Sequence, residues 1–127
     1  SAVARACLDL EVGAPRLARR LFALGLEVRD LSGRPLLTPK EALGEDGERL
    51  LLERAREALM EAAPLATTER LTQPLEKGPV AGRSVQEVLR DPDPEILRAF
   101  FQAVLENPER LAETDVVNAF VNWLLEP

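Results

Sequence analysis

The clearest pattern of hydrophobic and polar positions lies in the last third of the chain, residues 91–127. Apolar residues recur there at intervals of three and four over residues 94–105 and again over residues 116–125, the spacing of one broad apolar face on a helix. Asp93 precedes the first stretch as a capping side chain, and Thr114 precedes the second. We expect two helices that bury their apolar faces against each other as a hairpin.

A different pattern, in which apolar and polar residues alternate, occurs in the first third of the chain. It covers residues 6–12, 26–29 and 34–37, and a period of two is typical of a strand with one buried face. Residues 16–24 instead have leucines at helical spacing, and Gly25 follows them as a suitable helix terminator. We therefore expect a small N-terminal sheet of about three short strands, with a helix between the first two.

Helical spacing also predicts a long helix in the middle of the chain, over residues 47–63. A short helix should precede it, because Thr38 and Glu41 match a capping box, and residues 84–87 repeat this box before a helix that ends near residue 90. We expect the long helix to cover the sheet. The fold class predicted is therefore α+β and helix-dominant, with a C-terminal helical module.

Prolines and glycines interrupt the periodicity over residues 74–83, which indicates a loop or linker. This interruption divides the chain into an N-terminal α+β part at residues 1–73 and a C-terminal helical module at residues 84–127. One continuous domain is the alternative, because 127 residues suit a single core.

The composition argues against catalysis. The chain has no histidine, no tyrosine and one cysteine, Cys7, so it lacks the side chain best suited to proton transfer near pH 7 and cannot form an intramolecular disulfide. The acidic residues match no calcium-loop spacing. We therefore predict a protein that is not an enzyme, with no catalytic residue, no metal site and no cofactor.

The net charge of −6 belongs to the C-terminal third. Residues 1–90 contain 14 acidic and 14 basic residues, whereas residues 91–127 contain eight acidic and two basic residues. Nucleic acid would be repelled by this end, so we expect no direct nucleic-acid binding.

No apolar run has the length of a membrane span, and the first residues lack the features of a signal peptide, so we expect a cytoplasmic location. Fourteen arginines against two lysines give a thermophile-like composition.

Two groups of residues are candidate binding sites. Arg16, Arg19 and Arg20 follow a strand-to-helix junction and could hold an anion at the helix start, although a solvated arginine face is the simpler interpretation. Asn118, Asn122 and Trp123 form a neutral polar strip beside an indole on the last helix, which could be a contact surface. The alternative for Trp123 is that it closes the end of the core.

Three classes of function are compatible with these features. The leading hypothesis is a non-catalytic protein-interaction module, an accessory subunit or assembly factor of a larger complex, with a protein partner or a second copy as its target. The second is an acidic regulator or inhibitor that docks on a basic, nucleic-acid-binding site of another protein. The third is a small anionic-ligand binder or enzyme at the N-terminal sheet, recognised by a deep pocket with convergent polar groups.

Overall fold

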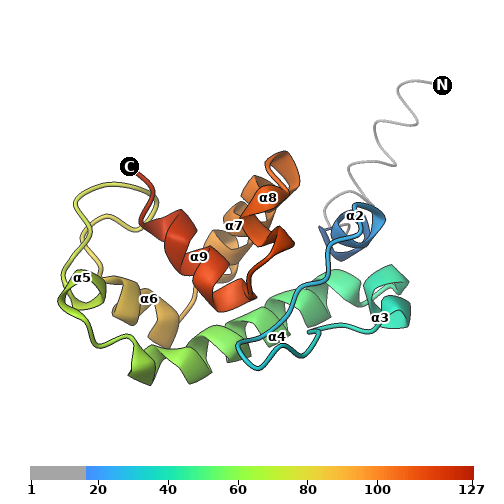
Figure 1. Cartoon of the computed structure of the whole chain (residues 1–127), viewed down its shortest axis with the longest axis horizontal. Coiled ribbons are helices and arrows are strands. Elements are labelled where there is room, and N and C mark those ends of the chain that lie inside the picture. Colours follow the sequence, from blue (N-terminus) through green and yellow to red (C-terminus); the bar gives the residue numbers. More distant parts are fainter. Residues whose placement is uncertain (1–16) are drawn as a thin grey trace.

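A computed structural model describes residues 17–127 of the chain, and helices dominate this part (Figure 1). In chain order the helices are α2 (Leu17–Ala23), α3 (Pro39–Leu43), α4 (Gly47–Ala62), the 3-10 turn η2 (Ala63–Leu65), α5 (Glu69–Thr72), α6 (Val85–Arg90), α7 (Pro94–Glu106), α8 (Glu109–Ala112) and α9 (Val116–Leu124). None of these helices is long and apolar enough to cross a membrane.

The predicted N-terminal sheet is wrong for the part of the chain that the structure describes, so the α+β class is corrected to a helical fold. The first expected strand, residues 6–12, lies outside the described residues. The other two, residues 26–29 and 34–37, are extended but share only one isolated antiparallel bridge, between Arg29 and Pro35. Two backbone hydrogen bonds flank it, from Leu36 N to Val28 O and from Asp30 N to Arg34 O.

Apolar and polar residues alternate here for a reason other than sheet formation. The two segments form a short turn that packs its apolar side chains against helices. Val28 and Leu36 are buried because they belong to the helical core. Pro35 has no N–H to donate, and the Leu36 carbonyl accepts a hydrogen bond from the Arg54 guanidinium at 2.8 Å. Such a two-stranded ribbon is too short to grow into a sheet.

Helix α4 is the centre of the fold. Its apolar stripe, which includes the fully buried Leu51, Ala55 and Leu59, packs against α2, α3, α6, α7 and α9. The long helix was expected to cover a sheet, and it contacts helices instead. Figure 1 shows α4 running along the lower side of the molecule, with α6, α9 and α2 above it and α3 beside its end.

The predicted C-terminal helices are present, and only the cap of the second differs from the prediction. Asp93 caps α7 by accepting a hydrogen bond from Glu95 N at 2.8 Å. Asp115, not Thr114, caps α9. Both helices pack against α4, and aromatic side chains fill the space between them: the Phe100 and Phe120 rings lie 5.4 Å apart, edge to face.

The segment predicted as a loop or linker is a closed loop that contacts the core. Leu75 N donates to Arg83 O at 2.9 Å and Gly82 N donates to Leu75 O at 2.8 Å, while Val80 is buried. The residues before and after this loop share one hydrophobic core, since α4 contacts both α7 and α9. Residues 74–83 therefore separate two parts that differ in composition but share one core. That the two parts fold independently stays a prediction.

Candidate binding pocket between α2, α3 and α4

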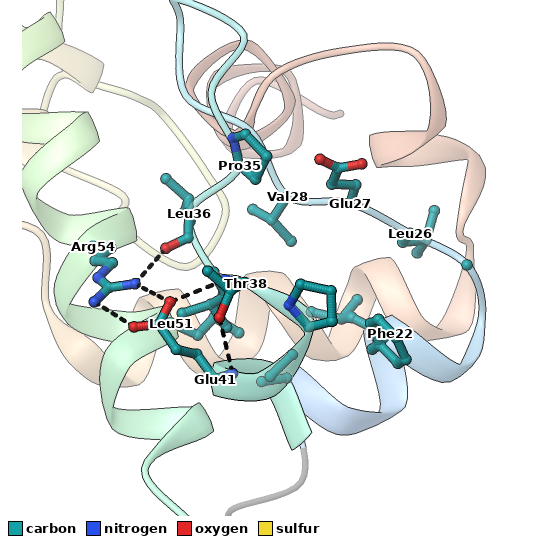
Figure 2. A pocket seen from close by; sticks show the side chains of 16 residues that line it. Phe22, Leu26, Glu27, Val28, Pro35, Leu36, Thr38, Glu41, Leu51 and Arg54 are labelled. Atoms are coloured by element: carbon teal, nitrogen blue, oxygen red, sulfur yellow. Dashed lines mark hydrogen bonds and ion pairs between the residues drawn. The ribbon is translucent and has the colours of Figure 1, made fainter. Parts of the chain in front are cut away.

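A pocket of about 610 Å³ lies between α2, α3 and α4, under the two extended segments (Figure 2). This volume is within the range of small-molecule and anchor-residue sites. Its lining is mainly apolar and comes from four parts of the fold: Ala18, Leu21, Phe22 and Gly25 from α2 and the turn after it, Leu26 to Val28, Pro35 to Pro39, and Glu41, Ala42, Leu51 and Arg54 from α3 and α4.

The helical repeat explains why α2 contributes to this pocket. Residues 18, 21, 22 and 25 are three or four apart, so they lie on one face of the helix and its terminating turn. Leu21 is 1% exposed and forms the floor with Val28 and Leu51. Phe22 is 41% exposed and lies at the rim. Small side chains on the lining, Ala18 among them, leave the space that larger residues would fill.

One wall of the pocket carries a closed network of polar groups. Thr38 and Glu41 form the predicted capping box, with Thr38 N donating to Glu41 Oε1 at 2.9 Å and Glu41 N donating to Thr38 Oγ1 at 3.1 Å. Arg54 donates from Nη1 to Glu41 Oε1 at 2.7 Å and from Nη2 to Oε2 at 2.8 Å. Figure 2 shows these contacts on the Arg54 side of the pocket.

This network keeps the Glu41 carboxylate ionised and hydrogen-bonded to Arg54 and Thr38. The hydrogen bond from Arg54, followed by the one from the Thr38 amide, lowers the pKa of Glu41 from 4.5 to about 2. The same pairing raises the pKa of Arg54. A carboxylate with so low a pKa is a poor general base near pH 7, and its oxygens already accept hydrogen bonds from Arg54 and from the Thr38 amide.

A second, shallower pocket of about 320 Å³ adjoins the first. Asp30, Arg34, Glu57 and Glu61 give it a charged lining, and Pro35, Leu36 and Arg54 line both pockets. Within residues 17–127, no group of three or more aspartate, glutamate, cysteine or histidine side chains converges as a metal site would require.

The predicted anion-binding arginines do not gather at either pocket. Arg16 lies outside the described residues. Arg19 is exposed and donates to the Leu43 carbonyl oxygen, which joins α2 to the end of α3. Arg20 is exposed on α2, and neither residue lines a pocket. Cys7 and the strand-to-helix junction at Gly13 also lie outside the described residues.

The three residues of the predicted contact strip on α9 have different surroundings. Asn118 Nδ2 donates to Asp115 Oδ2 at 2.8 Å, so this amide is engaged at the start of the helix. Trp123 is half-buried, with its ring 5.7 Å from Phe100 and 5.9 Å from Phe120. Asn122 is exposed. Trp123 thus packs on the aromatic core, and its role in contacting a partner stays a prediction.

Sequence reasoning missed the pocket and its residues. The available signal was the apolar character of Phe22, Leu26 and Leu37 in segments too short to bury all of them. Their convergence depends on how α2, α3 and α4 pack, and a periodic pattern carries no information about that packing.

Comparison of the chain with protein-family models, with curated protein sequences and with solved structures finds no match.

Proposed function

We propose that this protein is a non-catalytic interaction module, an accessory subunit or assembly factor of a larger complex, and that a protein partner inserts an apolar side chain into the pocket between α2, α3 and α4. The observation that supports this most directly is the pocket itself. It combines an apolar floor with a wall whose charged groups, Glu41 and Arg54, already satisfy each other.

An exposed apolar residue at the mouth supports a partner of this kind. Phe22 lines the pocket and is 41% exposed. Exposed apolar side chains next to a concave site are typical of protein contacts, in which one or two anchors contribute most of the binding energy. Arg19 ties the Phe22-bearing helix to the Leu43 carbonyl, so these two elements present a fixed surface.

The second hypothesis, an acidic regulator of a basic site, draws only on the charge of the C-terminal third. The third, an anionic-ligand site, is less compatible with the pocket because Arg54 is already neutralised by Glu41. An anion would have to displace a bidentate pair, which is among the stronger polar contacts in proteins.

The test compares two substitutions that introduce the same charge on neighbouring exposed residues. Phe22→Glu places a carboxylate at the mouth of the pocket, whereas Leu24→Glu changes a side chain that is 51% exposed and does not line it. Each variant and the wild type are used to capture partners from a lysate of the source cells. The captured protein is then purified, and its affinity for each variant is measured by calorimetry.

We expect Phe22→Glu to weaken binding of the purified partner at least tenfold and Leu24→Glu to leave it within about twofold of the wild type. Circular dichroism must show that both variants keep the helical content and melting behaviour of the wild type. Equal affinity of the two variants would remove the pocket from the interaction. Turnover of a small substrate by the purified chain would contradict the non-catalytic assignment.

A further inference from the structure

The two pockets lie side by side and differ in chemical character. Pro35, Leu36 and Arg54 line both, so the two pockets are adjacent and meet at the hydrogen bond from Arg54 to the Leu36 carbonyl. The first pocket is mainly apolar. The second is lined by three carboxylates, those of Asp30, Glu57 and Glu61, beside two arginines.

Two of the five charged side chains in the second pocket, those of Arg54 and Asp30, are already engaged within the fold. Arg54 is held by Glu41. Asp30 Oδ1 accepts hydrogen bonds from Ser32 N at 2.9 Å, from Ser32 Oγ at 2.7 Å and from Arg34 N at 3.0 Å. These contacts stabilise the turn, and they lower the pKa of Asp30. The Asp30 and Arg54 side chains are therefore committed to intramolecular partners.

Glu57 and Glu61 differ from Asp30 and Arg54 in this respect, and Arg34 is then the one cation of this pocket that is not already held by a carboxylate among residues 17–127. They are four residues apart, so they lie one turn apart on the same side of α4, and both are exposed. Within residues 17–127 no salt bridge joins either carboxylate to a cation. On the same helix, by contrast, Glu53 pairs with Arg49 at 3.1 Å. The second pocket thus presents negative charge to a ligand.

We propose that the adjacent pockets dock an extended peptide segment of a partner, with an apolar side chain in the first pocket and a lysine or arginine beside Glu57 and Glu61. The inference rests on the proposed function and specifies the chemistry of the partner. Its basis is charge complementarity: a basic side chain finds two carboxylates next to the apolar site, whereas an acidic segment would be repelled. A peptide fits better than a compact neutral molecule, because an extended backbone can present different side chains to successive pockets.

Random short peptides displayed on phage are the probe, because they make no assumption about the partner. They are selected at low salt on the full chain, and the enriched peptides are synthesised with a fluorescent label. Affinities are measured by anisotropy for the wild type, for Phe22→Glu with its control Leu24→Glu, and for the double variant Glu57→Gln/Glu61→Gln. Glu53→Gln is the matched control for the double variant, since it removes the same kind of charge from α4 outside both pockets.

We expect the enriched peptides to combine an apolar residue with lysine or arginine. Glu57→Gln/Glu61→Gln should weaken their binding roughly fivefold, and added salt should weaken wild-type binding while affecting the double variant much less. Glu53→Gln should bind as the wild type does. Phe22→Glu should weaken binding at least tenfold, and Leu24→Glu should not.

Three results would overturn the inference, and they separate it from the proposed function. Peptides that need Phe22 but lack a basic residue, or that bind the double variant normally, would reject the basic partner and leave the apolar pocket in place. Peptides that are insensitive to Phe22→Glu would reject the pocket and with it the proposed function. If no peptide is enriched and the chain instead self-associates in a way that Phe22→Glu abolishes, the occupant is a second copy and the basic partner is rejected.

Discussion

Arg54 donates a hydrogen bond to each carboxylate oxygen of Glu41, at 2.7 and 2.8 Å, and these two bonds join the middle of α4 to the first turn of α3. The same guanidinium donates to the Leu36 carbonyl. One side chain therefore fixes three elements that line the pocket: α3, α4 and the extended segment before α3. These hydrogen bonds help the irregular segment at Leu36 keep its position against the two helices.

Replacing Arg54 tests this role. Arg54→Met keeps an unbranched apolar stem but removes every donor, so Glu41 and the Leu36 carbonyl each lose a partner. We expect a lower melting temperature, by roughly 5 °C, and weaker binding at the pocket, because α3 and the segment at Leu36 lose their hydrogen bonds to α4. Arg49→Met is the control, since Arg49 pairs with Asp46 and Glu53 on the exposed side of α4 and should cost far less. Equal melting temperatures for the two variants would contradict a special role for Arg54.

The low pKa of Glu41 predicts an acid-dependent loss of stability. Arg54 and the Thr38 amide lower this pKa from 4.5 to about 2 in the folded protein. The unfolded chain therefore binds the proton more readily, so the stabilisation is complete above pH 4.5 and is lost as the pH falls from 4.5 towards 2. Urea denaturation of the wild type and of Glu41→Gln, measured between pH 7 and pH 2, isolates this group. The gap between the two should be largest at neutral pH and close over that window; a constant gap would refute the assignment.

Glu48 should act in the opposite direction. Its side chain is only 13% exposed, Oε1 has no hydrogen-bond partner among residues 17–127, and Arg98 Nε lies 3.8 Å away. Burial raises the pKa of Glu48 despite the opposing charge of Arg98. Ionisation is then disfavoured in the folded state, so the contribution of Glu48 to stability is complete below pH 4.5 and falls as the pH rises through the higher folded-state pKa.

Glu48→Gln removes that cost. We expect the variant to gain stability relative to the wild type as the pH rises from 4 to 7, because glutamine carries no charge to desolvate and Arg98 keeps its ion pair with Glu95. Thermal denaturation at the two pH values measures the difference. Glu53→Gln, on the exposed side of the same helix, should change little at either pH. A loss of stability relative to the wild type over the same rise in pH would show that the attraction to Arg98 outweighs the cost of burial.

Trp123 can be tested for the two roles that remain open to it. It packs against Phe100 and Phe120 but is only half-buried, so Trp123→Ala should cost about 2 kcal/mol, less than removal of a fully buried aromatic residue. Binding of the peptides or of the captured partner should stay unchanged if the indole only closes the core. A loss of binding in a variant that is still folded at the assay temperature would establish the contact surface predicted on α9.

The features that could be predicted from the sequence are those set by neighbouring residues. Helical spacing anticipated α4, α7 and α9 to within about two residues, and the capping box at Thr38 has both of its hydrogen bonds. Prediction failed where alternation had two explanations: Val28 and Leu36 alternate with polar residues because a turn packs them onto helices, not because a sheet exists. The pocket was inaccessible to sequence reasoning because Leu21, Val28 and Leu51 converge only through tertiary packing.

Cutting the chain after Arg90 tests whether the acidic C-terminal third can fold by itself. We expect that it cannot fold alone, because α7 and α9 bury their apolar faces on α4. In addition, Val116 N donates to Arg29 O at 2.8 Å across the proposed division. Residues 91–127 alone would expose Phe100, Phe101 and Phe120 and would form too small a core to offset the loss of chain entropy.

We expect each fragment, 1–90 and 91–127, to show weak helical circular dichroism with no cooperative melt. An equimolar mixture should regain helix and bury the single tryptophan, Trp123, as its fluorescence shifts to shorter wavelength. A cooperative melt of the isolated fragment 91–127 would instead establish two domains, and the shared core would then be an interface between them.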